Sequence, residues 1–332
     1  MNKAKRVFIT GGAGYVGSIL VPKLLNKGHY VKVIDLYIYG EDVLNSVKDN
    51  PKLIQIKGDI RNKELIEREI KGYDTVIHLA CISNDPSCEL NPALTREINY
   101  DAFIQLVDVA KNNKVERLIY ASSSSVYGIK KEEEVTEDLP LEPLTDYSKY
   151  KAKCEEVLMN ASKKGFVIVI VRPSTVCGYS PRMRLDLTVN ILTNHAINKE
   201  EITVFGGEQM RPNIHIEDMT DLYVYLLGLA DERIDRKIYN VGYENYKIKD
   251  IAKMVQETLG HQIPIKTLPT NDNRSYHISS RKIKEEIGFS PKYTVKEAIF
   301  DMKRAFEEGK IPNPMTDIKY YNVKTMKAIR LV

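Results

Sequence analysis

Apolar residues in the first half of the chain gather in short runs of strand length, and longer segments with helical periodicity separate these runs. This alternation is typical of β-α-β units that share one parallel sheet. The pattern predicts strands over 6–10, 30–35, 53–57, 75–79, 117–122 and 166–172. It predicts helices over 15–27, 63–70, 92–112 and 148–163. Six strands joined by such crossovers form a doubly wound α/β sheet, whose ligands bind beyond the carboxyl ends of the strands.

The alternation breaks down after residue 172. Loops and short helices follow, with one or two returning strands, one of them at Tyr239–Val241. We therefore expect a large sheet domain over 1–172 and a smaller lobe over 173–332. Because some segments of the second part return to the sheet, we expect this lobe to be interleaved with the large domain.

Charge and cysteine content exclude several classes of protein. The 332 residues include 49 basic and 45 acidic side chains, a net charge of +4, and no basic block marks a nucleic-acid surface. The four cysteines lack C-x-x-C spacing, so we predict neither a metal site nor a disulfide framework. No apolar stretch reaches ~18 residues and no leader precedes the first strand, so we expect a cytoplasmic protein without a membrane partner.

A glycine-rich turn carries the first chemical signal. Gly-Gly-Ala-Gly-Tyr-Val-Gly at 11–17 follows the first predicted strand and opens the first predicted helix, the context that dinucleotide binding requires. Glycines let a diphosphate approach backbone N–H groups, and the helix N-terminus adds partial positive charge. The residues assigned here to the cofactor are Gly11, Gly14, Tyr15, Val16 and Gly17.

Asp35 ends the second predicted strand, about 20 positions after the glycines. A carboxylate there accepts hydrogen bonds from the ribose hydroxyls of NAD and repels the 2′-phosphate of NADP. No arginine follows it directly, so the sequence favours NAD. The 1–172 domain is thus predicted to be a Rossmann-type NAD-binding domain, and 173–332 to be mainly substrate-binding.

A serine run and a tyrosine-lysine pair form a candidate catalytic group. The run Ser122–Ser125 leaves the fifth strand, and Tyr147 lies four residues before Lys151, one turn along a predicted helix. That spacing alone is uninformative, because three other tyrosines also have a lysine four positions on. Here, however, it falls at the carboxyl edge of the sheet, together with the serines.

Hydride transfer from an alcohol needs a base for the hydroxyl proton, and a free tyrosine with a pKa of ~10 is a poor base at neutral pH. We expect the ammonium of Lys151 and the charge of oxidised nicotinamide to lower the pKa of Tyr147. A serine hydroxyl can position the substrate oxygen. The three pieces together predict a nicotinamide enzyme acting on an alcohol.

In order along the chain, these motifs resemble the extended short-chain dehydrogenases/reductases, specifically the nucleotide-sugar (NAD-dependent) epimerase/dehydratase family. The resemblance covers nearly the whole length. The further segments that carry it are Gly58-Asp59-Ile60, His78-Leu79-Ala80, the Asn99 helix, Arg172-Pro173, Arg211–Asp218 and Arg274-Ser275-Tyr276.

The resemblance implies roles for individual residues. Ser123 takes the position of the family's catalytic serine or threonine, beside Tyr147 and Lys151. The further residues that it implies for NAD are Asp59, Ile60, Leu79, Ala80, Cys81, Asn99, Ser122, Tyr147, Lys151 and Pro173. Those implied for the nucleotide-diphosphate sugar are Asn84, Ser123, Ser124, Arg211 and Arg274. Both of these arginines suit the diphosphate, because a guanidinium offers a planar fork of donors.

The segment after Ser123 bears on the reaction. Family members that eliminate water place Asp-Glu there, whereas this chain has Ser124-Ser125, so a 4,6-dehydratase is disfavoured. A 4-epimerase and a 4-dehydrogenase, acting on a hexose or heptose, both stay open, and a 4-keto-sugar reductase is a further alternative. A non-enzymatic NAD-binding role is disfavoured by the intact catalytic residues. The loops 83–88 and 177–184 resemble those of a family branch that modifies bacterial surface-polysaccharide precursors, GDP-heptoses among them.

Two further expectations concern surfaces. The loops 83–88 and 177–184 are predicted to flank the sugar, but we expect Arg182 and Arg184 to be surface arginines rather than nucleotide contacts. The predicted helices 92–112 and 148–163 carry apolar residues beyond one narrow stripe. Pairing in a homodimer and burial against the sheet explain them equally well.

Overall fold

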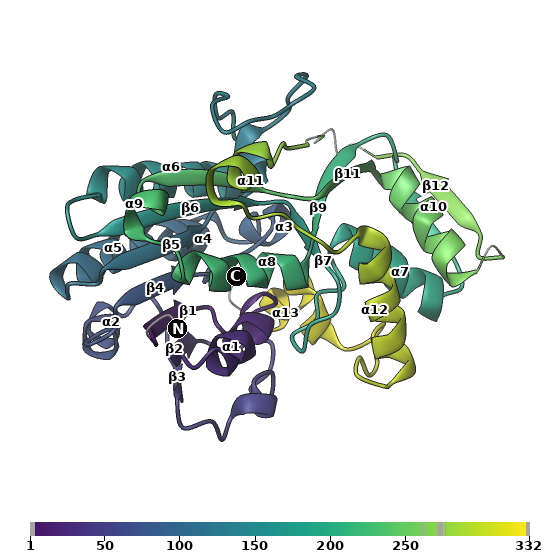
Figure 1. Cartoon of the computed structure of the whole chain (residues 1–332). Helices are drawn as coiled ribbons and strands as arrows, with labels where there is room; N and C mark the ends of the chain where they lie inside the picture. Colours follow the sequence, from purple (N-terminus) through teal and green to yellow (C-terminus); the bar gives the residue numbers. More distant parts are fainter. Residues whose placement is uncertain (1–3, 261, 271–274, 276, 330–332) are drawn as a thin grey trace.

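The computed structural model describes residues 4–260, 262–270, 275 and 277–329. Its centre is a parallel sheet of seven strands in the order β10-β6-β5-β4-β1-β2-β3 (Figure 1). The strands are β1 (Arg6–Thr10), β2 (Tyr30–Asp35), β3 (Leu53–Lys57), β4 (Thr75–His78), β5 (Arg117–Ala121), β6 (Val167–Pro173) and β10 (Lys237–Val241). The six predicted strands are confirmed to within a residue at each end, and the returning strand at 239–241 is the seventh.

Helices cover both faces of the sheet, because successive residues of each strand point to opposite faces. In β1, Val7 and Ile9 pack with α1 (Gly17–Asn26) and α8 (Ile216–Leu227). Phe8 packs on the other face, in the cluster that holds the apolar residues of three helices. These helices are α2 (Lys63–Glu69), α5 (Ala102–Asn112) and α6 (Asp146–Ala161). The doubly wound α/β prediction is confirmed.

The predicted helix 92–112 is not continuous. It consists of α4 (Pro92–Arg96), a π-helical turn η2 (Glu97–Asp101) and α5. Phe103, Leu106 and Val107 of α5 are at most 3% exposed and pack towards the sheet. The core of one chain therefore accounts for them, and they offer nothing to a second copy.

The smaller lobe contains two short sheets and three main helices, drawn at the right of Figure 1. One sheet joins β11 (Glu244–Lys247), β9 (Met210–His215) and β7 (Thr175–Cys177), and the other joins β12 (Ile265–Leu268) to β8 (Ile202–Phe205). The helices are α7 (Thr188–Asn198), α10 (Ile248–Leu259) and α12 (Val295–Glu307). The short helix α11 (Arg281–Ile287) returns to the main sheet, where Ile283 and Ile287 join its core.

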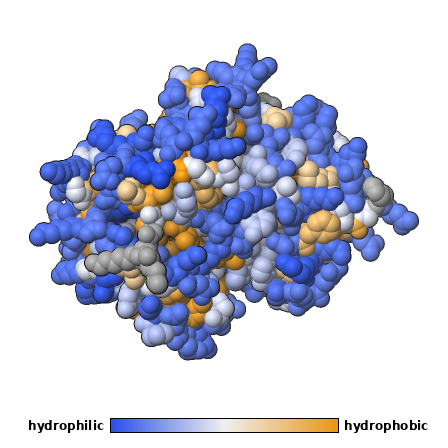
Figure 2. Space-filling view, in the orientation of Figure 1, coloured by the Kyte–Doolittle hydropathy of each residue, from blue (hydrophilic) through white to orange (hydrophobic). Residues whose placement is uncertain are grey.

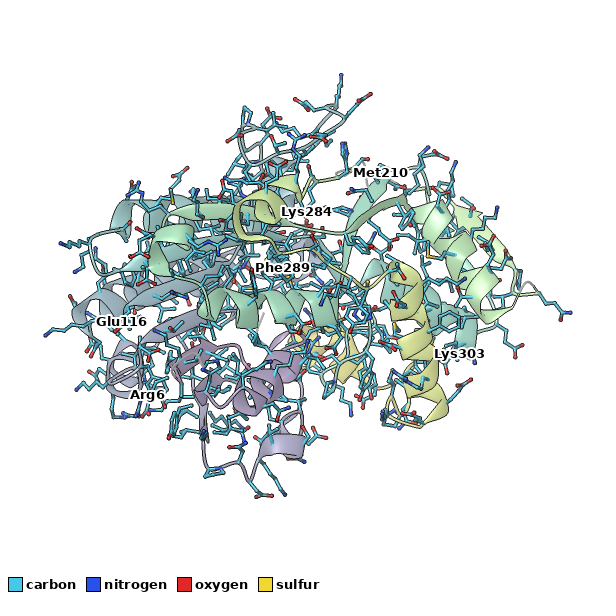
Figure 3. All side chains as sticks on the ribbon, viewed as in Figure 1. Arg6, Glu116, Met210, Lys284, Phe289 and Lys303 are labelled. Atoms are coloured by element: carbon cyan, nitrogen blue, oxygen red, sulfur yellow. The ribbon has the colours of Figure 1, made fainter. Side chains whose placement is uncertain are left out.

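The strands point their carboxyl ends towards this lobe. Arg6 and Glu116, at the amino ends of β1 and β5, lie on the side away from Met210 and Lys303, which mark the smaller lobe (Figure 3). The last helix, α13 (Asn322–Ala328), contacts the short helix α3 (Asp85–Cys88) beside those carboxyl ends. Hydrophilic residues dominate the face drawn in Figure 2. Across the described part of the chain, no helix is long and apolar enough to cross a membrane.

Candidate active site

A cavity of about 360 Å³ opens at the carboxyl ends of the strands. The predicted site residues that line it are Gly11, Gly14, Tyr15, Val16, Gly17, Asp35, Asp59, Ile60, Leu79, Ala80, Cys81, Asn84, Ser122, Ser123, Ser124, Tyr147, Lys151 and Pro173. Asn99 and Arg211 are not among its lining residues, and Arg274 lies outside the described residues. The cavity therefore brings the cofactor motif and the catalytic group together.

The glycine-rich turn is shaped for a close approach. A Cβ on Gly11, which has φ +75°, would lie 2.6 Å from the backbone N of Ala80, and one on Gly17 would lie 2.4 Å from the carbonyl oxygen of Gly12. A Cβ on Gly14 would meet only the carbonyl oxygen of Gly11 within 4 Å, so the space next to Gly14 is open. The turn thus leaves a cradle at the N-terminus of α1 that fits the diphosphate of NAD.

Asp35 stands beside this cradle. Its carboxylate accepts hydrogen bonds from the N–H groups of Ala13 at 3.0 Å and Tyr37 at 2.9 Å. Burial raises the pKa of Asp35 above its ordinary value, although these two bonds oppose the rise. The carboxylate is thereby fixed where the NAD-binding arrangement places the adenosine ribose.

Asp59 and Asn99 support the cavity wall in different ways. Asp59 accepts hydrogen bonds from the backbone N–H, Nε and Nη2 of Arg61. Burial acts to raise the pKa of Asp59, but the bonds with Arg61 outweigh it, so the pKa lies below its ordinary value. The Oδ1 of Asn99 accepts from the N–H of Ile82 at 2.7 Å, and its Nδ2 donates to the carbonyl of Ile82 at 2.9 Å. Asn99 therefore braces the 80–82 segment from behind.

The tyrosine and the lysine are held by the start of α6. Thr145 caps this helix in a reciprocal capping box with Ser148, so the helix begins two residues before the predicted start. Lys151 donates from Nζ to the carbonyl of Ala121 at 2.6 Å, and its Nζ lies 5.7 Å from the centre of the Tyr147 ring. Lys151 is 5% exposed, so its ammonium acts in a poorly solvated setting.

Ser123 begins the short 3-10 helix η3 (Ser124–Tyr127) as its N-cap. Its Oγ accepts from the N–H of Ser125 at 3.1 Å and lies 2.9 Å from the Oγ of Ser125. Burial raises the pKa of Tyr147 well above its ordinary value, Cys81 and Asp85 raise it further, and a hydrogen bond with Ser123 lowers it. The protein alone thus favours the neutral phenol, and the lowering of the Tyr147 pKa expected from Lys151 together with oxidised nicotinamide stays a prediction for the complex with NAD.

A buried polar network stands behind the serine run. Arg172 donates from Nε to Glu155 Oε1 at 3.0 Å and from Nη2 to Glu155 Oε2 at 2.6 Å, and Ser122 donates its hydroxyl to the same carboxylate. Arg172 also donates to the hydroxyl of Tyr127, which donates to Asn240. This network ties β5 to α6, β6 and β10, so the backbone that carries Ser123 is fixed from behind.

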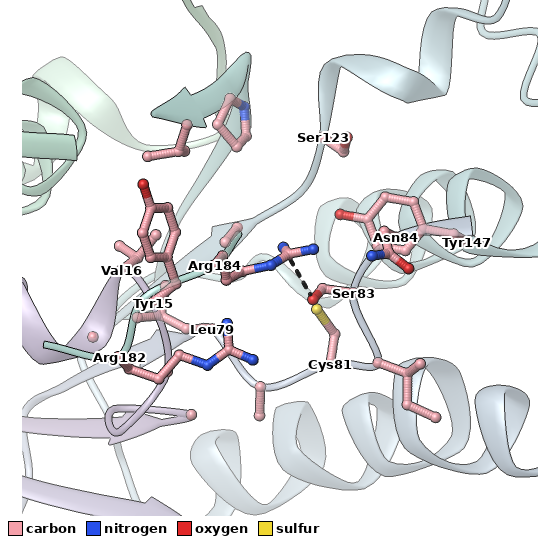
Figure 4. A pocket seen from close by; sticks show the side chains of 18 of the residues that line it. Tyr15, Val16, Leu79, Cys81, Ser83, Asn84, Ser123, Tyr147, Arg182 and Arg184 are labelled. Atoms are coloured by element: carbon pink, nitrogen blue, oxygen red, sulfur yellow. Dashed lines mark hydrogen bonds between the residues drawn. The ribbon is translucent and has the colours of Figure 1, made fainter. Parts of the chain in front are cut away.

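Two arginines in the cavity wall correct one prediction. Arg182 and Arg184 are 3% and 9% exposed and both line the cavity, so the expectation of surface arginines is wrong. Arg184 donates to both oxygens of Asp186 and, at 3.4 Å, to the Oγ of Ser83 (Figure 4). Burial opposes the charge of Arg184, but Asp186 raises its pKa above the ordinary value. Asn84, at φ +78°, caps α3 by accepting from the N–H of Ser87.

Of the two predicted diphosphate arginines, Arg211 lies in β9 and donates from Nη1 to the carbonyl of Met210. The sequence interpretation also missed several lining residues, among them Tyr39, Thr175 and Met326, whereas Ser83 and Asp85 belong to the loop 83–88, predicted to flank the sugar. Tyr39 and Met326 come from segments without any recognisable motif. Within the described ranges, no group of three or more His, Cys, Asp or Glu side chains gathers as metal ligands would.

These features define a class of protein: a Rossmann-type fold in which a dinucleotide-binding glycine turn and a Ser-Tyr-Lys group line one cavity. The family model described as "NAD dependent epimerase/dehydratase family" matches residues 7–242. The chain belongs to this family, and NAD is its cofactor.

Known proteins agree with this assignment. UDP-glucose 4-epimerase of Corynebacterium glutamicum is 27% identical over 323 residues, which cover 91% of this chain and 95% of that protein. UDP-glucuronic acid 4-epimerase from Bacillus cereus, solved with UDP-glucuronic acid and NAD, has a TM-score of 0.82 and 26% identity, with 91% and 99% coverage. A dTDP-glucose 4,6-dehydratase from Streptomyces venezuelae has a TM-score of 0.84 at 23% identity, with 93% and 99% coverage, and shares the fold.

Proposed function

We propose that this enzyme oxidises C4 of a nucleotide-diphosphate hexose or heptose with NAD and returns the hydride to the opposite face, as a 4-epimerase. The observation that carries the proposal is the joint position of Ser123, Tyr147 and Lys151 on the wall of the cofactor cavity. The likeness to UDP-glucose 4-epimerases over almost the whole chain supports it.

Each catalytic side chain has a distinct part in the proposed reaction. Bound NAD supplies the hydride acceptor and its positive charge. Tyr147 accepts the proton of the C4 hydroxyl and later returns it, while the buried ammonium of Lys151 stabilises the phenolate. The Oγ of Ser123 donates a hydrogen bond to the C4 oxygen, since its Oγ already accepts from the N–H of Ser125.

Dehydration is disfavoured because it also needs an acid and a base at the carbons next to C4. Ser124 and Ser125 line the cavity after Ser123, at the positions where carboxylates would have to act. Of the lining carboxylates, Asp35 bonds to backbone N–H groups and Asp59 to Arg61, while Asp85 accepts from the hydroxyl of Thr145 and comes from the loop 83–88 rather than from the segment after Ser123. The chemistry proposed for the cavity thus ends with the return of a hydride.

The test is a product analysis. The purified protein is incubated with a panel of UDP-, GDP-, dTDP- and CDP-sugars, with and without a 2-oxo acid as electron acceptor. Products of unchanged mass and inverted C4 are expected. Loss of two hydrogens would replace the proposal by a 4-dehydrogenase, and loss of water would refute the argument from Ser124 and Ser125.

Variants on one helix provide a matched pair for this assay. Tyr147→Phe is expected to abolish turnover while NAD still binds. Tyr150→Phe removes a hydroxyl from the same helix, where the ring stacks on Tyr100 outside the cavity lining, and is expected to keep activity. Equal activity in both variants would show that Tyr147 is not the acid/base.

We further propose that the enzyme acts in the cytoplasm as a homodimer, in the synthesis of bacterial surface-polysaccharide precursors. Because Phe103, Leu106 and Val107 are buried within one chain, a dimer would have to use other residues of α5 and α6. Sedimentation of the purified protein tests the dimer, and a single-chain mass would contradict it.

A further inference from the structure

The side chain of Arg182 is buried without a full set of partners. It is 3% exposed, and within the described part of the chain its Nε and Nη1 have no hydrogen-bond partner. Its Nη2 donates to Oδ1 of Asn322 at 2.5 Å, and the guanidinium carbon lies 3.7 Å from the centre of the Tyr39 ring. Figure 4 shows the guanidinium pointing into the cavity.

Asp186 and Asp35 favour the charge of Arg182, but among the described residues no carboxylate forms an ion pair with it. A buried guanidinium without a bonded carboxylate is costly, since its lost hydration is only partly replaced. Burial lowers the pKa of Arg182 to about 10, which still leaves it charged at neutral pH. Its neighbour Arg184 does have a counter-ion, because Asp186 accepts hydrogen bonds from Nε and Nη2 of Arg184. The unused donors of Arg182 therefore indicate an anionic group that enters the cavity with a ligand.

The backbone of the Arg182 loop is bonded to the first turn of α1. The N–H of Arg182 donates to the Oγ of Ser18 at 3.4 Å, and the Oγ of Ser180 donates to the carbonyl of Tyr15 at 2.7 Å. The hydroxyl of Tyr15 donates to the carbonyl of Gly178 at 2.6 Å. These bonds hold Arg182 over the helix N-terminus, where the glycine cradle receives a diphosphate.

We infer that Arg182 binds the diphosphate of NAD from the side opposite the glycine-rich turn. A planar guanidinium with two free donors matches two phosphate oxygens. The substrate's diphosphate has the same chemistry, but the bonds to Ser18 and Tyr15 place Arg182 on the cofactor half of the cavity. This inference rests on the NAD dependence of the family and is independent of the reaction proposed above.

Asn322 is the positioning residue for this contact. Besides accepting from Arg182, it donates its backbone N–H to Asp186 Oδ2 at 3.1 Å and its Nδ2 to Ser83 Oγ at 2.9 Å. The side chain and the backbone N–H of Asn322 thus together connect Arg182, the counter-ion of Arg184 and Ser83. Asn322 opens the last helix, 80 residues after the matched family segment ends at residue 242, so no family motif predicts its role.

The test measures ligand binding by calorimetry on the NAD-free full-length protein. Arg182→Met is expected to weaken ADP-ribose, which contains the diphosphate, by about 10- to 100-fold, the range for charge-assisted hydrogen bonds. Adenosine, which lacks the diphosphate, and UDP, which resembles the substrate's nucleotide, are expected to bind as in the wild type. Arg68→Met removes the same charge from an exposed ion pair and is expected to change none of the three.

Several results would overturn the inference. Unchanged ADP-ribose binding would do so, as would a loss confined to UDP, which would assign Arg182 to the substrate. An equal loss for adenosine would show a merely structural role. Because the free protein buries a guanidinium that bonds to no carboxylate, Arg182→Met is expected to melt no lower than the wild type without ligand, and a lower melting temperature would contradict this.

Two other variants test the inference if Arg182→Met does not fold. Arg182→Lys keeps the charge but loses the fork, so its ADP-ribose affinity is expected to fall less than tenfold, with adenosine unchanged. Asn322→Ala is expected to weaken ADP-ribose in the same selective way, because Arg182 loses its anchor. Wild-type ADP-ribose binding in both variants would refute the inference without Arg182→Met.

Discussion

The buried pair of Arg172 and Glu155 provides a quantitative test of the packing behind the catalytic serines. Their side chains are 3% and 4% exposed, and both donors of the guanidinium fork reach the carboxylate. Glu155→Ala removes the carboxylate and leaves a buried guanidinium without its counter-ion. Breaking such a pair costs about 3–5 kcal/mol in the free energy of unfolding. The hydroxyl of Ser122 also loses its acceptor, which adds to the loss.

The assay is urea denaturation of the two variants Glu155→Ala and Glu116→Ala beside the wild type. Glu116 is the matched control, because its pair with Lys5 at 3.4 Å is on the surface, with the carboxylate side chain 62% exposed. Exposed pairs contribute about 0–1 kcal/mol, so this control is expected to unfold at nearly the wild-type midpoint. A loss below about 1 kcal/mol for Glu155→Ala would refute the reasoning that the pair holds β5 to α6.

Three further predictions concern the cofactor site and the core. Asp35→Asn is expected to weaken the affinity for NAD about tenfold or more, which calorimetry measures. Because burial raises the pKa of this carboxyl, its charge does not stabilise the free protein, so the melting temperature without ligand is expected not to fall. Burial lowers the pKa of His78 to about 3. As the pH falls below 6.5, His78 therefore binds a proton in the unfolded chain but stays neutral in the native state. Stability is therefore expected to fall between pH 6.5 and 4, by at most roughly 3 kcal/mol from this group, and His78→Gln is expected to flatten that slope in urea titrations. Gly17→Ala is expected to cost about 1–3 kcal/mol and most NAD binding, because its Cβ would meet Gly12; wild-type affinity would contradict the cradle.

The parts of the structure that the sequence predicts are those with local causes. In β1, Val7, Phe8 and Ile9 alternate between the two cores, and the glycines that follow need a tight turn within a few residues. Tyr147 and Lys151 meet because one helical turn separates them. Each of these features is fixed by neighbours in sequence, so periodicity and spacing suffice to find it.

The failures have distant causes. Arg182 is typical of a surface residue by type, and it is buried because Asn322, 140 positions later, and Tyr39 close over it. The π-helical turn within the predicted helix 92–112 contains Asn99, whose side chain bonds to Ile82 across the fold. Contacts of this kind depend on the tertiary arrangement, so no window of sequence around Arg182 or Asn99 indicates them.

The most direct test of the central claim follows deuterium placed at C4 of the nucleotide sugar that turns over best. If the cavity oxidises C4 and Tyr147 moves the hydroxyl proton, the deuterium returns to C4 of the inverted product in ordinary water. Tyr147→Phe is then expected to abolish this inversion while ADP-ribose still binds. Replacement of the deuterium by solvent hydrogen at C4, with inversion intact, would contradict the account, because the C–H bond would then break without hydride transfer to NAD.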